Sequence, residues 1–200
     1  MMFERTRRLL AGLALAAGAV VLGGCAHPIT LAPDLAKVTS TSPKIAKTAG
    51  FYISAEDKAR EVTTPGGGGD KVSYFPYREL EPGIYKVLSE TFADVVRLDK
   101  PNDPAAAAAR SVNIVITPKI NTTSASDSAF TWPPTEFTVE FDVAVTDVQG
   151  RPVTNIKVLG QGKAPFSEFK ADFSLSAKRA SDDALAKLLK ALSDSPELRK

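Results

Sequence analysis

The strongest pattern along the chain is an alternation of apolar and polar residues between positions 135 and 147. A period of two predicts a long β-strand with one buried face and one exposed face. The buried face is predicted to hold Phe137, Val139, Phe141, Val143 and Val145. Asp147-Val148-Gln149-Gly150 then predicts a hairpin turn, because glycine accepts a positive φ, and residues 152–163 form the returning strand. The alternation slips near Asn155 and Ile156, which indicates a bulge.

Two other segments repeat their apolar residues every three or four positions, as one face of an α-helix does. The first runs from Pro82, a residue type suited to the first turn of a helix, to Leu98. Its buried face is predicted to hold Ile84, Val87, Leu88, Phe92, Val95 and Val96. The second runs from about Ser176 to Leu192. Its buried face is predicted to hold Ala184, Leu185, Leu188, Leu189 and Leu192. A last short turn is predicted after Ser195-Pro196.

Shorter strands are predicted at 50–54, 72–77 and 111–120, with loops at 99–110 and 121–134. Pro76 ends the strand at 72–77 or confines it to a sheet edge. Gly66 to Gly69 predict a flexible connection and not a phosphate-binding loop, because Asp70, not glycine, precedes Lys71. This order of elements predicts an α+β fold, with a mostly antiparallel sheet and two helices packed on one face.

The start of the chain has the order of a secretory signal peptide, with a basic head, an apolar middle and small residues before a cysteine. Leu22-Gly23-Gly24-Cys25 resembles the lipobox of bacterial lipoproteins. That resemblance implies cleavage after Gly24 and acylation of Cys25. The alternative is an uncleaved transmembrane anchor, because the uncharged run from Leu9 to Ala26 is at the lower edge of a membrane-spanning length. The four glycines within that run favour the cleaved signal.

The chain is therefore expected to have three parts. Residues 1–24 are the lipoprotein signal peptide, residues 25–48 are the lipidated cysteine and a flexible tether, and residues 49–200 are a single α+β periplasmic domain. The tether is predicted from a composition rich in proline, threonine, serine and alanine, without an apolar period.

Composition excludes several kinds of chemistry. Without the signal peptide, lysine and arginine balance aspartate and glutamate, so we expect no nucleic-acid binding. Acylation of the only cysteine leaves no thiol for a disulfide or a nucleophile. His27, the only histidine, is expected to be solvated in the tether, two residues after the lipid. The domain then has neither a Ser-His-Asp triad nor a common zinc site, and we expect no metal and no cofactor.

Together with the lipobox, the order of elements resembles small bacterial envelope lipoproteins, most closely the YajG-like family of uncharacterised function. The matching features are Cys25-Ala26 with its tether, the helix at 82–98, the strand at 112–116, the hairpin from 137 to 150 and the helix at 180–192. The topology is also similar to peptidoglycan-synthase activator lipoproteins, CsgG and the TolB N-terminal domain. The resemblance brings no catalytic residues. Ala26, where a retained lipoprotein would often have aspartate, looks like an outer-membrane destination facing the periplasm.

Two aromatic groups are candidates for partner binding, because aromatic residues on loops and edges often anchor interfaces. Trp132 precedes Pro133-Pro134, while Tyr74, Phe75 and Tyr77 surround Pro76. The alternative is that these side chains cover the sheet within the same chain.

We expect a non-enzymatic binding or accessory protein, lipid-anchored in the outer membrane, whose partner is an envelope protein or a glycan. One alternative is an auxiliary lipoprotein of a lipid or glycan transport system. Another is a carboxylate-based envelope hydrolase that uses Glu140 and Asp142.

Overall fold

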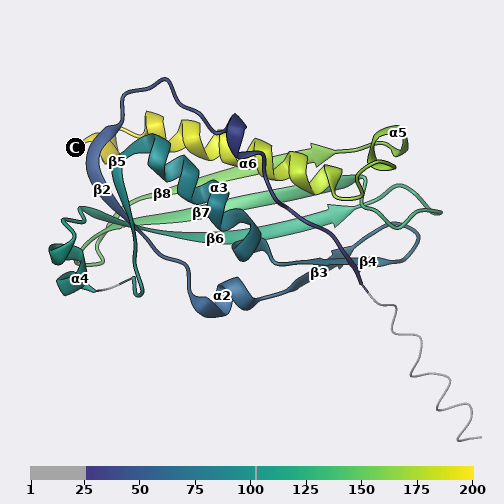
Figure 1. The fold of residues 1–200 in the computed structure, drawn as a ribbon, viewed down its shortest axis with the longest axis horizontal. Helices are drawn as coiled ribbons and strands as arrows, with labels where there is room; N and C mark the ends of the chain where they lie inside the picture. The colour runs from purple at the N-terminus through teal and green to yellow at the C-terminus, as the bar shows by residue number, and fades with distance from the viewer. Residues whose placement is uncertain (1–25, 102) are drawn as a thin grey trace, which may run out of the picture.

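The structure, a computed structural model, describes residues 26–101 and 103–200, so the predicted signal peptide and Cys25 lie outside it. A five-stranded sheet in the order β5-β2-β6-β7-β8 forms one layer, and two long helices form the other (Figure 1). The strands are β2 (Ile45–Phe51), β5 (Phe92–Arg97), β6 (Ile114–Ala125), β7 (Glu136–Asp147) and β8 (Pro152–Lys163). The α+β class predicted from the sequence is confirmed.

The large sheet is mixed rather than mostly antiparallel. Strands β6, β7 and β8 are antiparallel neighbours, but β2 runs parallel to both β5 and β6. The predicted hairpin is confirmed, and Gly150 has a φ of +81° in its turn. The register shift lies between Val145 and Thr146, opposite the start of β8, and not at Asn155 and Ile156.

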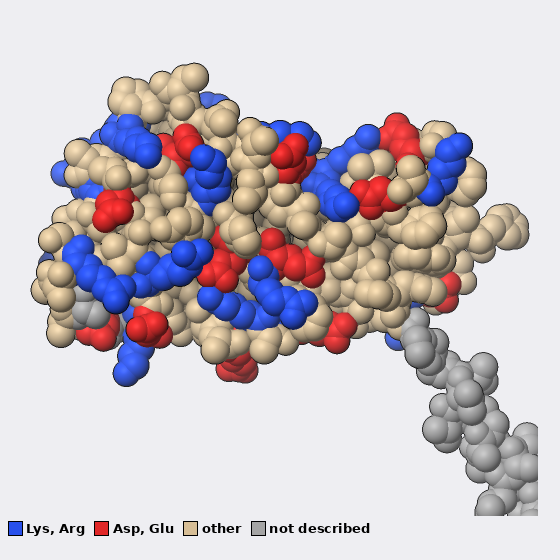
Figure 2. All heavy atoms as spheres, viewed as in Figure 1, with Lys and Arg blue, Asp and Glu red and all other residues tan. Residues whose placement is uncertain are grey.

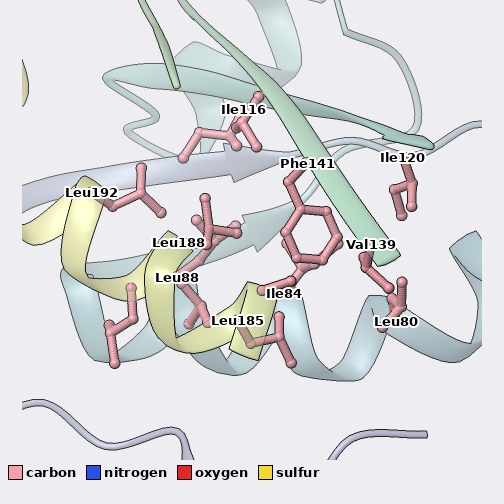
Figure 3. Close-up of a cluster of buried hydrophobic side chains, with 14 of the residues drawn as sticks. Leu80, Ile84, Leu88, Ile116, Ile120, Val139, Phe141, Leu185, Leu188 and Leu192 are labelled. Atoms are coloured by element: carbon pink, nitrogen blue, oxygen red, sulfur yellow. The ribbon is translucent and has the colours of Figure 1, made fainter. Parts of the chain in front are cut away.

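The helical layer consists of α3 (Pro76–Thr91) and α6 (Leu175–Asp194). Side chains from both helices meet Phe141 of β7 over the sheet (Figure 3). The face predicted for the last helix is buried, with Leu185, Leu188 and Leu192 fully enclosed. Gly160 of β8 lets α6 approach closely, because a Cβ there would lie 2.3 Å from the Ala180 carbonyl oxygen.

The first long helix differs from the prediction at both ends. It begins at Pro76 and ends at Thr91, so Pro82 lies inside it. The residues after it form β5, with Phe92 and Val95 buried and Asp94 exposed. Two apolar residues three positions apart fit a helix, and parallel pairing with β2 decides in favour of a strand.

A second, smaller sheet has the order β1-β4-β3. Its strands are β1 (His27–Pro28), β3 (Val62–Pro65) and β4 (Lys71–Tyr74). The strand predicted at 72–77 is thus central in this sheet and not an edge, and Pro76 opens α3. The short helices are α2 (Ala55–Ala59), α4 (Pro104–Ala109), α5 (Phe166–Phe169), η2 (Leu35–Lys37) and η3 (Glu197–Arg199). Among them, η3 confirms the predicted last turn.

Residues 26–44, called the N-terminal strap below, pack against the domain, and β2 begins at Ile45. The expectation of a flexible tether is therefore wrong for residues 26–48, the part of the predicted tether that the structure describes. Leu31 is completely buried, and Ile29 and Val38 are nearly so. The Thr30 hydroxyl and the Leu31 N–H both donate to one oxygen of Glu79, at 2.8 and 2.7 Å. The strap has no regular spacing of apolar residues, yet it packs on the domain because its backbone N–H groups donate to acceptors there and a few apolar side chains are buried.

The two ends of the strap are held by different elements. At its start, the Ile29 N–H donates to the Ser73 carbonyl of β4 at 3.0 Å. Further along, the Asp34 N–H and the Lys37 ammonium donate to the carboxylate of Asp182 on α6, at 2.8 and 2.6 Å. The strap therefore crosses the helical layer with contacts along its length (Figure 1).

Candidate functional site

Exposed aromatic side chains gather at the end of the molecule where the described chain begins. Phe130, in the β6–β7 loop, is 97% exposed; Phe166 of α5 is 61% exposed and Phe173, before α6, is 47% exposed. The β6–β7 loop, the β3–β4 turn and α5 all lie at this end (Figure 1). With His27 and Trp132, these three phenylalanines are called the aromatic end below.

Trp132 is partly buried against the main hydrophobic core and lies at the centre of the aromatic end. His27 stacks on it, with ring centroids 4.4 Å apart and an angle of 18° between the rings. Phe173 meets it edge-on at 5.0 Å. The Nε2 atom of His27 also lies 3.6 Å from the Oδ2 atom of Asp70. His27 is therefore part of the folded domain, which corrects the expectation of a solvated tether residue.

The glycine-rich turn between β3 and β4 supports the loop that carries Trp132. The Gly67 N–H donates to the Trp132 carbonyl at 2.8 Å, and the Gly68 N–H donates to the Ser128 carbonyl at 3.0 Å. A Cβ at Gly67 would lie 1.9 Å from the Thr131 carbonyl oxygen. The predicted flexible connection is thus an ordered turn. Because its glycines lack side chains, the β6–β7 loop can lie directly against it, and the glycine run alone did not indicate this role.

The second predicted group does not form a binding surface. Tyr74 is 1% exposed and Tyr77 is 3% exposed. The Tyr74 hydroxyl lies 2.8 Å from the Thr122 hydroxyl, and burial raises its pKa. The Tyr77 hydroxyl accepts the Ile120 N–H at 3.1 Å. Phe75 is half-buried under the Arg78 guanidinium, 3.7 Å from the ring centroid. Proximity to Pro76 suggested an edge, but β1 covers β4 on that side.

A cavity of about 460 Å³ opens beside the aromatic end, between the β6–β7 loop and the segment from β8 to α5. Ser128 and Thr131 line one wall, and Phe166 and Phe169 line another. Glu136 and Lys163, 2.6 Å apart across the β7–β8 pair, also line it. The segments that carry Phe130 and Phe166 therefore border the same cavity.

Asp142, one of the two carboxylates considered for hydrolysis, is paired with neighbouring side chains. Asp142 lies on the open face of the sheet, where the Lys157 ammonium and the Asn155 amide each donate to it at 2.8 Å. The Lys157 hydrogen bond, together with that of Asn155, lowers the pKa of Asp142. The lowered pKa keeps the Asp142 carboxylate charged. A general acid needs a raised pKa, so that it is protonated when it acts, and Asp142 does not fit that role. Over residues 26–101 and 103–200, no cluster of His, Cys, Asp and Glu side chains is placed to hold a metal ion.

Charges of both signs are interspersed over the face drawn in Figure 2. Among the described residues, ion pairs within one helix include Lys86 with Glu90 on α3 at 2.6 Å and Lys187 with Asp183 on α6 at 2.7 Å. In the part of the chain that the structure describes, no helix is both long and apolar enough to cross a bilayer.

No family model and no curated protein sequence matches the chain. Solved structures similar to it include XCC0632 of Xanthomonas campestris, described as family-model DUF330. That match has 11% identity and a TM-score of 0.44 and covers 84% of this chain and 89% of the other. A minor lipoprotein from Acinetobacter baumannii matches with 9% identity and a TM-score of 0.45, over 74% of this chain and 94% of the other. The resemblance to the YajG-like family stays a prediction. At TM-scores below 0.5, function has to be argued from the residues of this chain.

Proposed function

We propose that the chain is an envelope lipoprotein, anchored through acylated Cys25 and acting as a non-enzymatic binding or accessory protein. The observation that carries the proposal is the lipobox-like Leu22-Gly23-Gly24-Cys25 at the end of a signal-like segment. The ordered domain begins where the predicted signal peptide would end, because only Ala26 separates Cys25 from β1 (His27–Pro28).

An outer-membrane location facing the periplasm is part of the proposal. It rests on Ala26, since aspartate at the position after the lipidated cysteine favours inner-membrane retention in the lipoproteins that the lipobox resembles. Replacing Ala26 with aspartate should then move the protein to the inner-membrane fraction, while Ala26→Ser should leave its location unchanged.

The accessory role is supported by the chemistry of the side chains. The two carboxylates considered for hydrolysis, Glu140 and Asp142, lie on an open strand face, and Asp142 forms an ion pair with Lys157. Phe130 and Phe166 are fully or largely exposed on ordered segments instead. Such a distribution suits contact with another surface better than bond cleavage. An envelope protein or a glycan is the partner class proposed.

The test is the fate of Cys25. Mature wild-type protein isolated from membranes should begin at a Cys25 that carries acyl chains, as measured by mass spectrometry. Cys25→Ser should leave the signal peptide attached and remove the acyl mass. A wild-type protein with an unmodified Cys25 would contradict the proposal. Crosslinking in intact cells, followed by purification from membranes, would then identify the partner.

A further inference from the structure

The start of the N-terminal strap leaves almost no free chain between the lipid and the domain. His27 pairs with Val72 in the small sheet and stacks on Trp132 at 4.4 Å. Two residues of extended chain span at most about 7 Å, so Cys25 lies within that distance of the His27 backbone. A lipid on Cys25 therefore places the bilayer beside the aromatic end, and not tens of ångströms away as a flexible tether would.

The aromatic end exposes apolar surface where the bilayer would be. Phe130, Phe166 and Phe173 are the only exposed phenylalanines of the described residues. Isolated exposed apolar residues are common, but a group of them on neighbouring loops marks a contact surface. Aromatic rings are favoured at the boundary between lipid headgroups and hydrocarbon. The acyl anchor at Cys25 identifies lipid, and not a protein, as the first surface these rings meet.

The loop that carries Phe130 is ordered, so its ring is held outward. The Ser128 hydroxyl accepts the N–H groups of Phe130 and Thr131, at 3.3 and 3.1 Å. The Ser128 carbonyl accepts the Gly68 N–H of the β3–β4 turn. Little conformational entropy is then lost when the ring enters a second phase, which favours contact.

We propose that the aromatic end rests on the lipid bilayer that holds the Cys25 acyl chains, with Phe130 and Phe166 entering the interface. This rests on the proposed lipidation. Acyl anchoring alone would leave the domain free to tilt. The added aromatic contact gives it one orientation, with the aromatic end on the headgroups and the opposite end of the sheet directed away from the membrane.

Trp132 is the only tryptophan in the chain and serves as the reporter. The full mature lipidated protein is reconstituted into phosphatidylethanolamine and phosphatidylglycerol vesicles. These vesicles also contain phosphatidylcholine with a nitroxide either on the headgroup or near the end of an acyl chain. The headgroup nitroxide should quench Trp132 emission, and the deep one should quench it less. Flotation of the vesicles and the acyl mass of the protein are recorded on the same sample.

The double variant Phe130→Ser with Phe166→Ser removes both rings without touching the contacts of Trp132. Because burial of one phenylalanine is worth a factor of about ten in an equilibrium, the ratio of docked to lifted protein should fall by about a hundredfold. Quenching by the headgroup nitroxide should then largely disappear while flotation is retained. Leu159→Ser, on the open sheet face and also exposed, is the matched control and should leave quenching unchanged.

Three results would overturn the inference. If the lipidated protein floats with the vesicles but neither nitroxide quenches Trp132, the aromatic end faces away from lipid and lipidation still stands. If the double variant is quenched as strongly as the wild type, Phe130 and Phe166 do not hold the domain on the bilayer. A mature protein that carries no acyl mass and does not float would overturn the lipid anchor, and this inference with it.

Discussion

Glu79 is predicted to hold the N-terminal strap on the domain, and its replacement tests this directly. One carboxylate oxygen accepts the Thr30 hydroxyl and the Leu31 N–H, and the other accepts the Phe75 N–H at the start of α3 at 3.0 Å. Leu31, which these bonds position, is completely buried. Loss of Glu79 therefore removes a helix-start contact and the acceptor for the strap together.

The magnitude follows from the number and exposure of these bonds. A hydrogen bond to a charged group is worth ~1.5–3 kcal/mol. Glu79 is only partly buried, so the released donors regain some water contacts. Glu79→Ala is expected to lower the free energy of unfolding by ~2–4 kcal/mol, less than the sum of three such bonds. Exposed Glu61 is the matched control, and Glu61→Ala should change the free energy of unfolding by less than ~0.5 kcal/mol.

Urea unfolding measures the free energy, and limited trypsin digestion locates the change. In Glu79→Ala, cleavage after Lys37 and Lys44 should become faster than in the wild type, because the strap around them is released. Cleavage within α6 should not change at low trypsin concentration. Equal unfolding free energies together with equal cleavage at Lys37 would refute the role of Glu79.

Three further predictions concern the core, the aromatic end and pH. Leu188→Ala should destabilise the protein by ~2–4 kcal/mol, because the side chain is completely buried between α6 and the sheet; an unchanged melting temperature would show that α6 is not packed there. Trp132→Ala should cost ~2–4 kcal/mol in thermal or urea unfolding, since the ring is only partly buried but contacts His27 and Phe173; a loss below ~0.5 kcal/mol would contradict its role as a cover of the core. Burial alone would raise the pKa of Asp172. The hydrogen bonds from the Lys178 ammonium and the Ser174 N–H together outweigh burial, so the pKa of Asp172 lies below the ordinary 3.8. A lowered pKa means stability that is present above pH 3.8 and lost as the pH falls below it. In urea titrations the wild type should therefore lose more stability than Asp172→Asn between neutral pH and pH about 2, and parallel curves would exclude that contribution.

Long periodic segments could be predicted from the sequence because their partners are adjacent or their pattern is unbroken. The alternation in β7 continues through a tight turn into β8, so a single hairpin explains both. The face of α6 repeats over several turns, and its leucines are buried as expected. In each case the local pattern and the tertiary environment agree.

The remaining elements depend on contacts between residues far apart in the chain. Phe92 and Val95 fit a helix until β2, more than forty residues earlier, offers a parallel neighbour. Leu31 becomes a core residue because Glu79 accepts its N–H. Tyr74 and Tyr77 lie beside a proline, which suggested an edge. Instead, the Tyr74 ring packs edge-on against Phe137 of β7, and the Tyr77 hydroxyl accepts the Ile120 N–H of β6.

The aromatic end was predicted only at Trp132. Its neighbours come from three further segments that share no sequence pattern: His27 of β1, Phe166 of α5 and Phe173 before α6. A solitary histidine two residues after Cys25 gave no signal of its own, since stacking on Trp132 requires the strap to be docked. The site therefore arises from the fold rather than from a motif.

The central claim is that the lipid at Cys25 joins the domain with almost no spacer, and neutron reflectometry tests it most directly. Lipidated wild-type protein is measured on a supported bilayer, and the scattering profile locates protein relative to the headgroups. A docked strap predicts protein density that begins at the headgroup layer with no water-filled gap. A free tether of 23 residues would instead allow separations of up to ~80 Å. A distinct solvent layer between headgroups and protein would contradict the account.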